Sequence, residues 1–501
     1  MRGLKSKWCL VLSSLLFTTG VLYAGVSLPS FTYVQTDTAI KLEKPSGIFH
    51  YKGRAKRSNS NLRNVLIDVE IKPETPYTQN PQGVVHHTAP QDILHHPRVQ
   101  EWCHRPDSTF SGMEGSPVEG YKLSTVLVLV TPGHTVRNQQ QGDGVDSSCK
   151  LWEFLSKFSD DKLSSYQEML SIHKNMKVEK GGFKIFNSAP VSGFCKNGEL
   201  SPLGVSQHIK LGEFIRKAYF TQLKTLRTLP RDTMTMANCV QDQAAYQSTM
   251  AFLHGLFSEK QFIKAGIKKI QDNLCNSRNG LSCDCQTLSR HKDFITDPYD
   301  TALKYIPNIH TKSNLVYTDT IQKTSNLIAK NLRILNGVSQ ICQTNGEICK
   351  DDTKCNDMSM NSIVQVFNML DKSIFNITQS ADFISKSRLY SHPFLLKTVN
   401  LLMESKQDFA LYTIKDFLMV NLLVALGIPV NSLPSPASRV AIEVHERSLR
   451  SLSRKRVVRV LVNGRDYTPY LTACSVDFGP NCDLMLLQGL KLYNYDLECG
   501  N

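Results

Sequence analysis

A continuous apolar run at residues 126–130 is followed at once by a turn-forming segment at residues 131–137. The run has the length of a buried strand, and Pro132 and Gly133 in the segment after it end the strand and turn the chain. The two segments therefore predict a buried strand that ends in a tight turn, at the place where a phosphate-binding loop would sit.

Other segments alternate between strand and helix patterns. Residues 410–414 and 457–462 are apolar runs of strand length, whereas residues 203–220 and 420–426 have helical periodicity. Alternating elements of this kind indicate an α/β fold with helices on both faces of a sheet. With 501 residues, of which 41% are hydrophobic, the chain is long enough for two or three domain-sized units and a sizeable core.

Four segments, in order along the chain, resemble parts of one enzyme family, the histidine acid phosphatases. They are GELSPLGVSQHIKLG at 198–212, QSTMAFLHG at 247–255, FALYTIKD at 409–416 and VVRVLVNGRD at 457–466. The first is similar to the family's G-x-L-T-x-x-G-x-x-Q-H-x-x-L-G segment, the second to its second core helix, and the third to a strand that ends in a His-Asp pair. The resemblance covers roughly residues 100 to 500. It implies a sheet flanked by helices on both faces, with an inserted, mostly α-helical and disulfide-rich cap at about 213–370.

The resemblance also implies a mechanism. In the family's R-H-G-x-R-x-P motif the His attacks phosphorus, and the two Arg bind the phosphoryl oxygens as fixed positive charge. The phosphate-binding positions fall here on Thr131, Thr135, Ala244 and Lys415, the nucleophile falls on Pro132, and the proton donor is retained as Asp416. Because proline has neither a nucleophilic atom nor a backbone donor, phosphohistidine chemistry cannot run in this register.

A shifted register is the alternative for this motif. His134 and Arg137 have the i, i+3 spacing of the motif's His and second Arg, and a shift of two residues preserves strand alternation. This register still lacks the first Arg, leaves Ala244 unchanged and needs two extra loop residues. We therefore expect His134 to be an ordinary loop histidine.

Three functions are compatible with these substitutions. We expect a non-catalytic phosphatase-like protein that binds phosphorylated or sulfated glycan or acts with proteoglycan biosynthetic enzymes. The resemblance is to members that remove the 2-phosphate from xylose in the glycosaminoglycan linkage region, so a working phosphatase of that kind is the first alternative. A non-enzymatic glycan-binding ectodomain is the second. Loss of the nucleophile and of the Arg clamp should lower the rate by several orders of magnitude, which favours the non-catalytic class. No cofactor is expected.

The amino-terminal segment predicts entry into the secretory pathway. Arg2, Lys5 and Lys7 precede an apolar run at residues 8–28 that is long enough to span a bilayer. We expect residues 1–28 to be an uncleaved signal anchor of a single-pass type II protein of the Golgi or a related membrane, with its bulk in the lumen. A cleaved signal peptide and secretion are the alternative.

Residues 29–100 lack helical or strand periodicity and carry Pro, Ser, Thr and Asn, as is typical of a stem between a membrane and a folded domain. We expect the phosphatase-like domain to occupy residues 101–501. Within the stem, the sequence RAKR at 54–57 resembles a proprotein convertase site, although basic residues in a stem are more often simply solvated.

Fourteen cysteines indicate disulfides formed in an oxidising compartment. A zinc site is the weaker alternative, because Cys283 and Cys285 do not form a C-x-x-C pair and no His pair follows at finger spacing, so we expect no metal. Cys239 lies outside the family-like pattern and is expected to remain a thiol. Asn376 begins an N-glycosylation sequon. The disulfide candidates are Cys103, Cys149, Cys195, Cys275, Cys283, Cys285, Cys342, Cys349, Cys355, Cys474, Cys482 and Cys499.

The formal net charge is +14, and part of the positive charge is concentrated in one stretch. In the lumen such a polyanion patch would meet sulfated glycosaminoglycan rather than DNA, because charge sets the attraction and the compartment decides the partner. A solvated hairpin loop is an equally supported alternative. The sequence carries neither a Gly-rich nucleotide loop nor an aromatic RNA-binding pattern, so no nucleic-acid role is expected. The stretch contains Arg447, Arg450, Arg454, Lys455, Arg456 and Arg459.

Overall fold

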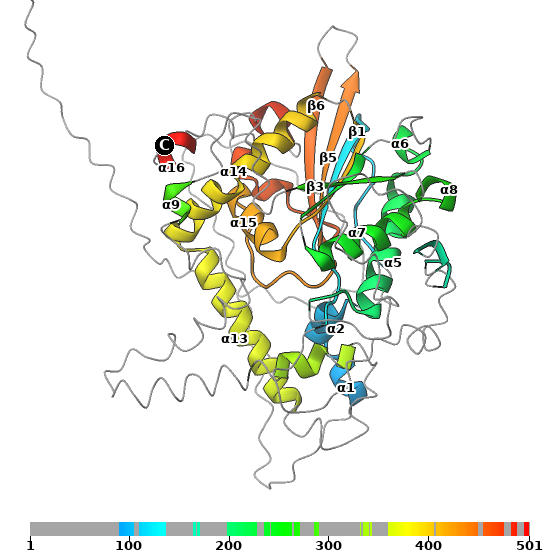
Figure 1. Cartoon of the computed structure of the whole chain (residues 1–501). Helices are drawn as coiled ribbons and strands as arrows, with labels where there is room; N and C mark the ends of the chain where they lie inside the picture. Colours follow the sequence, from blue (N-terminus) through cyan, green and yellow to red (C-terminus); the bar gives the residue numbers. More distant parts are fainter. Residues whose placement is uncertain are drawn as a thin grey trace, which may run out of the picture. The chain divides into compact units, whose positions relative to one another are not determined.

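One sheet forms the centre of the structure, which is a computed structural model (Figure 1). Within the described residues the sheet has eight strands in the order β3-β2-β4-β1-β5-β6-β7, and β8 pairs with β6. The strands are β1 Lys122–Val130, β2 Thr235–Val240, β3 Gly266–Ile270, β4 Phe409–Thr413, β5 Arg439–Ser448, β6 Arg454–Val462, β7 Arg465–Asp466 and β8 Cys482–Asp483.

The structure describes part of the chain. All of the described residues fall within one compact unit, Gly83–Asn501. The described ranges are 90–104, 110–136, 164–166, 168–170, 198–227, 235–240, 242–262, 265–270, 285–289, 331, 334–339, 341–342, 359–404, 407–448, 454–474, 482–487 and 495–499.

The sheet is mixed, and its parallel half sets the position of the candidate site. Strands β3, β2, β4 and β1 run parallel, whereas β5 and β6 are antiparallel additions. Val130 at the end of β1 is in register with Thr413 at the end of β4, so the carboxyl ends of these strands lie at one edge. The last five residues of β1 are fully buried, because a parallel sheet is covered on both faces.

Helices cover both faces, as the α/β pattern predicted. Neighbouring residues of β4 show this, because Thr413 bonds to Thr249 of α7 whereas Tyr412 packs against Phe394 of α14. Helices α5 (Pro202–Tyr219) and α7 (Gln243–Leu256) pack against each other, as do α14 (Ala381–Glu404) and α15 (Asp416–Leu426) (Figure 1). The expected helices at 203–220 and 420–426 correspond to α5 and to part of α15.

Several shorter or peripheral helices complete the described part. They are α1 Pro90–His95, α2 Pro97–Cys103, α6 Lys224–Arg227, α8 Glu259–Phe262, α9 Gln286–Ser289, α13 Met360–Thr378, α16 Tyr495–Cys499, and the 3₁₀ turns η5 Thr468–Tyr470 and η6 Thr472–Cys474.

The expected stem boundary at residue 100 is wrong. Helices α1 and α2 precede it, and Ile93, Leu94 and Val99 from these helices are buried in the main core. Prolines occupy the first position of both helices, where the missing N–H costs nothing and the fixed φ favours the helix. Prolines in a polar segment are typical of linkers, but these two begin helices.

The expected extent of the cap at 213–370 also needs correction. This range contains β2 and β3, which extend the central sheet, and α7, which packs on α5. The amino-terminal part of the range therefore belongs to the core of the fold. Within the range, residues 320–335 have the pattern of an amphipathic helix, and most of them lie outside the described residues.

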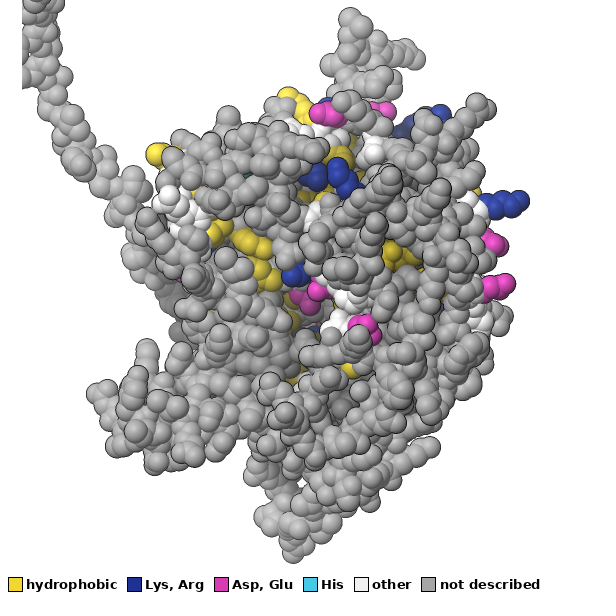
Figure 2. Space-filling view, in the orientation of Figure 1, with side chains coloured by type: hydrophobic (Ala, Val, Ile, Leu, Met, Phe, Trp, Pro, Cys, Tyr) yellow, Lys and Arg dark blue, Asp and Glu magenta, His cyan; other side chains and the backbone are white. Residues whose placement is uncertain are grey.

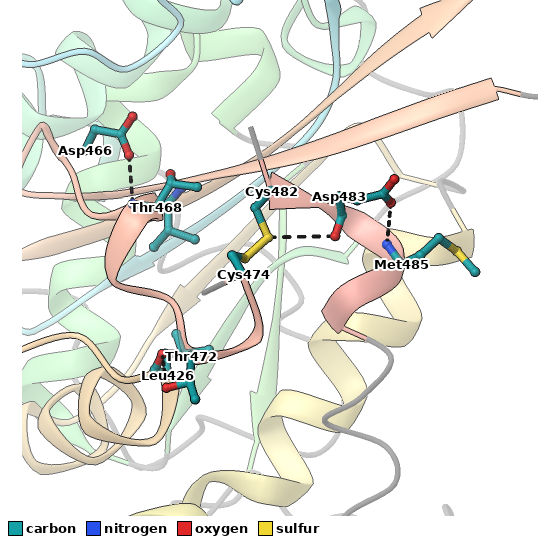
Figure 3. The surroundings of a disulfide bond; sticks show 9 residues. Leu426, Asp466, Thr468, Thr472, Cys474, Cys482, Asp483 and Met485 are labelled. Atoms are coloured by element: carbon teal, nitrogen blue, oxygen red, sulfur yellow. Dashed lines mark hydrogen bonds between the residues drawn. A yellow bond between two sulfur atoms is a disulfide. The ribbon is translucent and has the colours of Figure 1, made fainter. Parts of the chain in front are cut away.

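Three disulfides occur among the described residues, Cys103–Cys342, Cys285–Cys499 and Cys474–Cys482 (Figure 3 shows the third). Each joins two of the expected candidates. Cys239 is a buried thiol in β2 that donates to the carbonyl oxygen of Val240 at 3.1 Å. Six other candidates, Cys149, Cys195, Cys275, Cys283, Cys349 and Cys355, lie outside the described residues.

The described helices offer no membrane span, because none of them combines sufficient length with sufficient apolarity. The expected anchor at 1–28 and the stem up to residue 89 lie outside the described residues.

Candidate functional site at the carboxyl edge of the sheet

The loop after β1, residues 131–136, lies against the first turns of α5 and α7. A β-bridge joins Thr135 to Leu200, which precedes α5. A Cβ built on Gly133 would lie 2.7 Å from the carbonyl oxygen of Gly204, so the loop and α5 approach each other too closely for any side chain there. Gly133, the one motif residue that this chain retains in the first register, is thus required by backbone packing.

Thr131, at the position of the family's first Arg, is fully buried. Its N–H donates to the carbonyl oxygen of Ser438 at 2.9 Å, and its hydroxyl oxygen accepts from the N–H of Ser438 at 3.0 Å. The hydroxyl also lies 3.4 Å from the carbonyl oxygen of Ser435. The side chain at this position is therefore held in the turn before β5.

Backbone donors of the loop are bound by protein acceptors. The N–H of Gly133 donates to the hydroxyl of Ser248 at 3.1 Å, and the N–H of His134 donates to the side chain of Gln207 at 2.8 Å. The N–H of Val136 donates to the carbonyl oxygen of Glu199 at 2.8 Å. Pro132 has no N–H to offer. These groups therefore cannot serve a phosphoryl oxygen in this conformation.

His134, the nucleophile of the shifted register, has an exposed fraction of 3%. Its Nδ1 lies 2.8 Å from the hydroxyl of Ser201, and its Nε2 lies 2.5 Å from the hydroxyl of Ser339. Both ring nitrogens thus have serine partners, of which Ser201 is buried and Ser339 half-buried. The partner Arg of that register, Arg137, lies outside the described residues.

Two further side chains of the 198–212 segment also hold the loop, a role that the motif match alone did not specify. Gln207 binds the N–H of His134 and also donates to the carbonyl oxygens of Cys103 and His104 at 2.7 and 3.1 Å. Nε2 of His208 lies 3.1 Å from the carbonyl oxygen of Thr131. Burial lowers the pKa of His208 from 6.5 to about 3, although this hydrogen bond acts in the opposite direction.

Ala244, at the position of the third Arg, lies in the first turn of α7 with an exposed fraction of 4%. Asp242 caps this helix by accepting from the N–H of Ala245 at 3.0 Å. One turn further, the side chain of Gln247 accepts from the N–H of Leu200 at 2.8 Å. The start of α7 therefore supports the loop region through neutral hydrogen bonds and contributes a methyl group where the family has a cation.

Lys415 and Asp416 lie where β4 passes into α15. The N–H of Ile414 donates to the carbonyl oxygen of Val130 at 2.9 Å, which brings this junction level with the β1 loop. Lys415 is the N-cap residue and is half-buried, and Asp416 is exposed in the first turn, where the helix dipole favours a carboxylate. Figure 2 shows basic and acidic side chains close together between α15 and α7.

The topology thus brings the expected positions to the carboxyl edge of the sheet. The residues at these positions, however, lack most of the groups that phosphoryl transfer needs. Lys415 can attract an anion as a point charge, but it cannot form the bidentate fork that Arg makes with phosphoryl oxygens. Pro132 and Thr135 are half-buried. Among the described residues no group of three or more His, Cys, Asp or Glu side chains could hold a metal ion.

The expected polyanion patch is only partly exposed. Arg459 has an exposed fraction of 7%, and its Nε donates to Glu443 at 2.7 Å, so it does not belong to a surface patch. Arg456 is half-buried and donates to the carbonyl oxygen of Met403 at 2.9 Å. Strand alternation explains the difference, because Arg456 and Arg459 lie on opposite faces of β6.

Among the described side chains of the run, Arg447 and Lys455 are exposed, and they are directly opposite each other in the β5–β6 ladder. Arg450 and the side chain of Arg454 lie outside what the structure describes. The described part of the patch therefore consists of one like-charged pair near the end of the hairpin.

Glu443, the partner of Arg459, is fully buried and joins several elements. It accepts from the N–H of Gly115 and the hydroxyl of Tyr219, both at 2.8 Å, and lies 3.0 Å from Nε2 of His445. Burial alone would raise the pKa of Glu443, but the bond to His445, the charge of Arg459 and the other bonds outweigh it, so the pKa is lowered. Arg459 is therefore a structural counter-ion.

Comparison with known sequences finds relatives that share one name. The chain is 23% identical to 2-phosphoxylose phosphatase 1 of Xenopus tropicalis over 384 residues, covering 74% of this chain and 73% of the relative. It is 24% identical to the protein of the same name from Danio rerio, covering 72% and 76%, and 22% identical to that from Homo sapiens, covering 74% and 76%. The resemblance to histidine acid phosphatases is confirmed. No protein-family model matches the chain.

Solved structures with similar backbones include two phosphatases. A Bifidobacterium longum multiple inositol polyphosphate phosphatase in complex with inositol hexasulfate superposes with a TM-score of 0.45 at 11% identity, covering 78% of this chain and 95% of that one. A Hafnia alvei phytase in complex with tartrate superposes with a TM-score of 0.43 at 12% identity, covering 76% and 99%.

Proposed function

We propose that this histidine acid phosphatase-like chain, a relative of 2-phosphoxylose phosphatase 1, does not hydrolyse phosphate esters and instead binds phosphorylated or sulfated glycan. The observation that carries the proposal is the loop after β1. Proline occupies the nucleophile position, and the side chain at the first Arg position, Thr131, is bonded into the turn before β5. Neither residue can take part in phosphoryl transfer.

The retained acid does not restore catalysis. Asp416 is exposed at the start of α15, which suits a proton donor to a leaving oxygen. Protonation of a leaving group assists a reaction only after a nucleophile and a charge clamp are in place. Removal of the nucleophile alone can cost about as much rate as removal of a whole catalytic set. Asp416 alone therefore does not supply turnover.

Two observations support a glycan ligand. The relatives' name refers to a phosphorylated pentose, and Arg447 and Lys455 place exposed positive charge side by side on the β5–β6 hairpin. An anionic saccharide would relieve the repulsion between these two side chains. The proposed binding surface therefore lies outside the former catalytic centre, and Lys415 contributes at most a weak anion contact.

The secretory pathway is the proposed compartment. Three disulfides among the described residues suit an oxidising lumen. The sequon residue Asn376 is exposed on α13, which suits a glycosylated surface. Together with the apolar segment 8–28, these features support a type II Golgi protein, with proteoglycan biosynthetic enzymes as proposed partners.

A phosphatase assay tests the proposal. The purified chain and an active 2-phosphoxylose phosphatase 1 are compared between pH 4 and pH 7, on a generic aryl phosphate and on a linkage saccharide that contains phosphoxylose. We expect turnover by the relative and none above background by this chain. Turnover that persists through purification and disappears in Asp416→Asn would contradict the loss of catalysis. Turnover that disappears in His134→Ala would show the shifted register to be correct.

A further inference from the structure

Three side chains lie in one row across the face of the sheet that α14 covers. Lys268 of β3 is in register with Asn238 of β2, and Asn238 is in register with Tyr412 of β4. Residues paired in this way point to the same face of a sheet. The ring of Tyr412 packs edge-to-face on Phe394 of α14 at 5.5 Å, so the whole row faces α14.

A second lysine reaches this row from the helix. Nζ of Lys397 on α14 lies 5.5 Å from the ring centroid of Tyr412, a cation–π distance. Burial, followed by the nearby charge of Lys268, lowers the pKa of Lys397, and no described carboxylate counters this effect. Figure 2 shows basic side chains over the region of β3.

The two ammonium groups therefore flank the strand that carries Asn238. Asn238 is half-buried, and its amide nitrogen lies 3.5 Å from the carbonyl oxygen of Leu411, at the outer limit of a hydrogen bond. Two ammonium groups beside an amide donor repel each other when the space between them is empty. An anion in that space would be stabilised, because charged donors form the stronger class of hydrogen bond to an oxyanion.

We propose that Lys268, Lys397 and Asn238 form a binding site for a single phosphate or sulfate group, between α14 and the β3 edge of the sheet. The oxyanion would lie over β2, with one ammonium group on either side and the Asn238 amide below it. The site uses none of the residues of the former catalytic centre or of the β5–β6 hairpin, so it is independent of the proposed function.

Thermal unfolding of the full chain tests this site with inorganic sulfate as the probe. Unfolding midpoints are measured in sodium sulfate and in sodium chloride of equal ionic strength, so that general screening is the same. A ligand that binds only the folded state raises the midpoint with concentration. In the wild type we expect sulfate to raise the unfolding midpoint until the site is saturated. Lys397→Met should bind sulfate about tenfold more weakly, because it loses one charged hydrogen bond.

Matched variants separate binding from other effects. Sulfate also stabilises proteins because it is excluded from their surface. Lys260→Met, which changes an exposed lysine on α8, measures how much of the rise in midpoint comes from this general effect. If Lys397→Met is unstable in chloride, Lys268→Gln replaces it, since Lys268 is exposed. Equal sulfate increments in the wild type and in the Lys397 and Lys268 variants would overturn the proposal.

A further arm identifies the source of the group. The titration is repeated with a sulfated disaccharide at the same sulfate concentration. A larger increment than with inorganic sulfate, lost in Lys397→Met, supports a site for a saccharide-borne sulfate. Equal increments, again lost in Lys397→Met, support a site for the free oxyanion. Increments that survive in Lys397→Met with both probes would rule out the site.

Discussion

The side-chain oxygen of Gln207 accepts a hydrogen bond from the backbone N–H of His134 at 2.8 Å. The amide of the same side chain donates to the carbonyl oxygens of Cys103 and His104 at 2.7 and 3.1 Å. One buried glutamine thus joins the loop after β1 to the end of α2. The loop at the position of the phosphatase motif is therefore fixed to the buried core of the fold.

Replacement of Gln207 by leucine should destabilise the fold. Leucine fills a similar volume but leaves the His134 N–H and two carbonyl oxygens without partners, and buried unpaired groups cost about 1–3 kcal/mol each before relaxation. We expect a loss of about 3 kcal/mol in the free energy of unfolding, measured by urea denaturation. Gln100→Leu, at an exposed position on α2, is the control and should change little. Equal effects of the two changes would show that the Gln207 bonds add no stability.

The stability of the fold should fall in acid because of His208. Its Nε2 carries the proton, since the carbonyl oxygen of Thr131 can only accept, and protonation of the buried Nδ1 would add a charge to the interior. The pKa is about 3 in the folded state and 6.5 when unfolded, so the unfolded chain binds more protons below pH 6.5. The contribution of His208 to the free energy of unfolding is therefore complete above pH 6.5 and is lost as the pH falls toward 3. At pH 5 the loss is about 2 kcal/mol.

Denaturation of the wild type and of His208→Gln between pH 7.5 and pH 4.5 measures this contribution. Glutamine keeps a donor for the Thr131 carbonyl oxygen but does not titrate. We expect the variant to have a flatter dependence of stability on pH, even if it is less stable at neutral pH. Parallel profiles for the two proteins would mean that His208 does not remain neutral in the fold.

The most apolar elements were predictable from the sequence, because continuous apolar runs and helical periodicity follow directly from burial on both faces of a sheet. Strand β1, strand β4 and helix α5 lie where the pattern placed them. Strands β2 and β3 were missed because KKI in β3 and TMANC in β2 are neither continuous apolar runs nor alternating ones. Edge strands and short strands give weak signals because they are only partly covered.

The candidate site was less predictable, because side-chain direction depends on tertiary packing. A charge run in the sequence cannot show that Arg459 faces a buried glutamate sixteen residues earlier, whereas Lys455 faces solvent. Alternation along β6 was a usable signal, since residues three apart in a strand point to opposite faces. The prolines that begin α1 and α2 were a second usable signal, which composition alone obscured.

Loss of the disulfide Cys103–Cys342 should cost more stability than loss of Cys474–Cys482. The first closes a loop with a sequence separation of 239 and the second a loop with a separation of 8. Loop-closure entropy predicts a cost of about 5.5 kcal/mol for the first and about 2.5 kcal/mol for the second. The comparison uses Cys103→Ala with Cys342→Ala, and Cys474→Ala with Cys482→Ala, in urea denaturation. A reversed order would show that the folded state, rather than the unfolded chain, determines these costs.

Heparin affinity should depend on Arg447 and Lys455 and not on the whole basic run. Both side chains are exposed and directly opposite each other, so replacement of both by glutamine removes adjacent charges without removing buried contacts. We expect the double variant to bind heparin more weakly, with a shallower loss of affinity as salt rises, because exposed charges are screened. Arg465→Gln, an exposed change on β7, is the matched control and should have a smaller effect.

Two further variants separate the surface from the interior and from the former centre. Arg459→Gln leaves the buried carboxylate of Glu443 without its main counter-ion and should lower the free energy of unfolding by about 3–5 kcal/mol, so any loss of heparin binding would follow unfolding. Lys415→Ala should change heparin affinity little, because one lysine cannot form the Arg fork that holds a phosphoryl group. If Lys415→Ala removes binding while the Arg447 and Lys455 variant keeps it, the former catalytic centre is the ligand site and the hairpin surface is not.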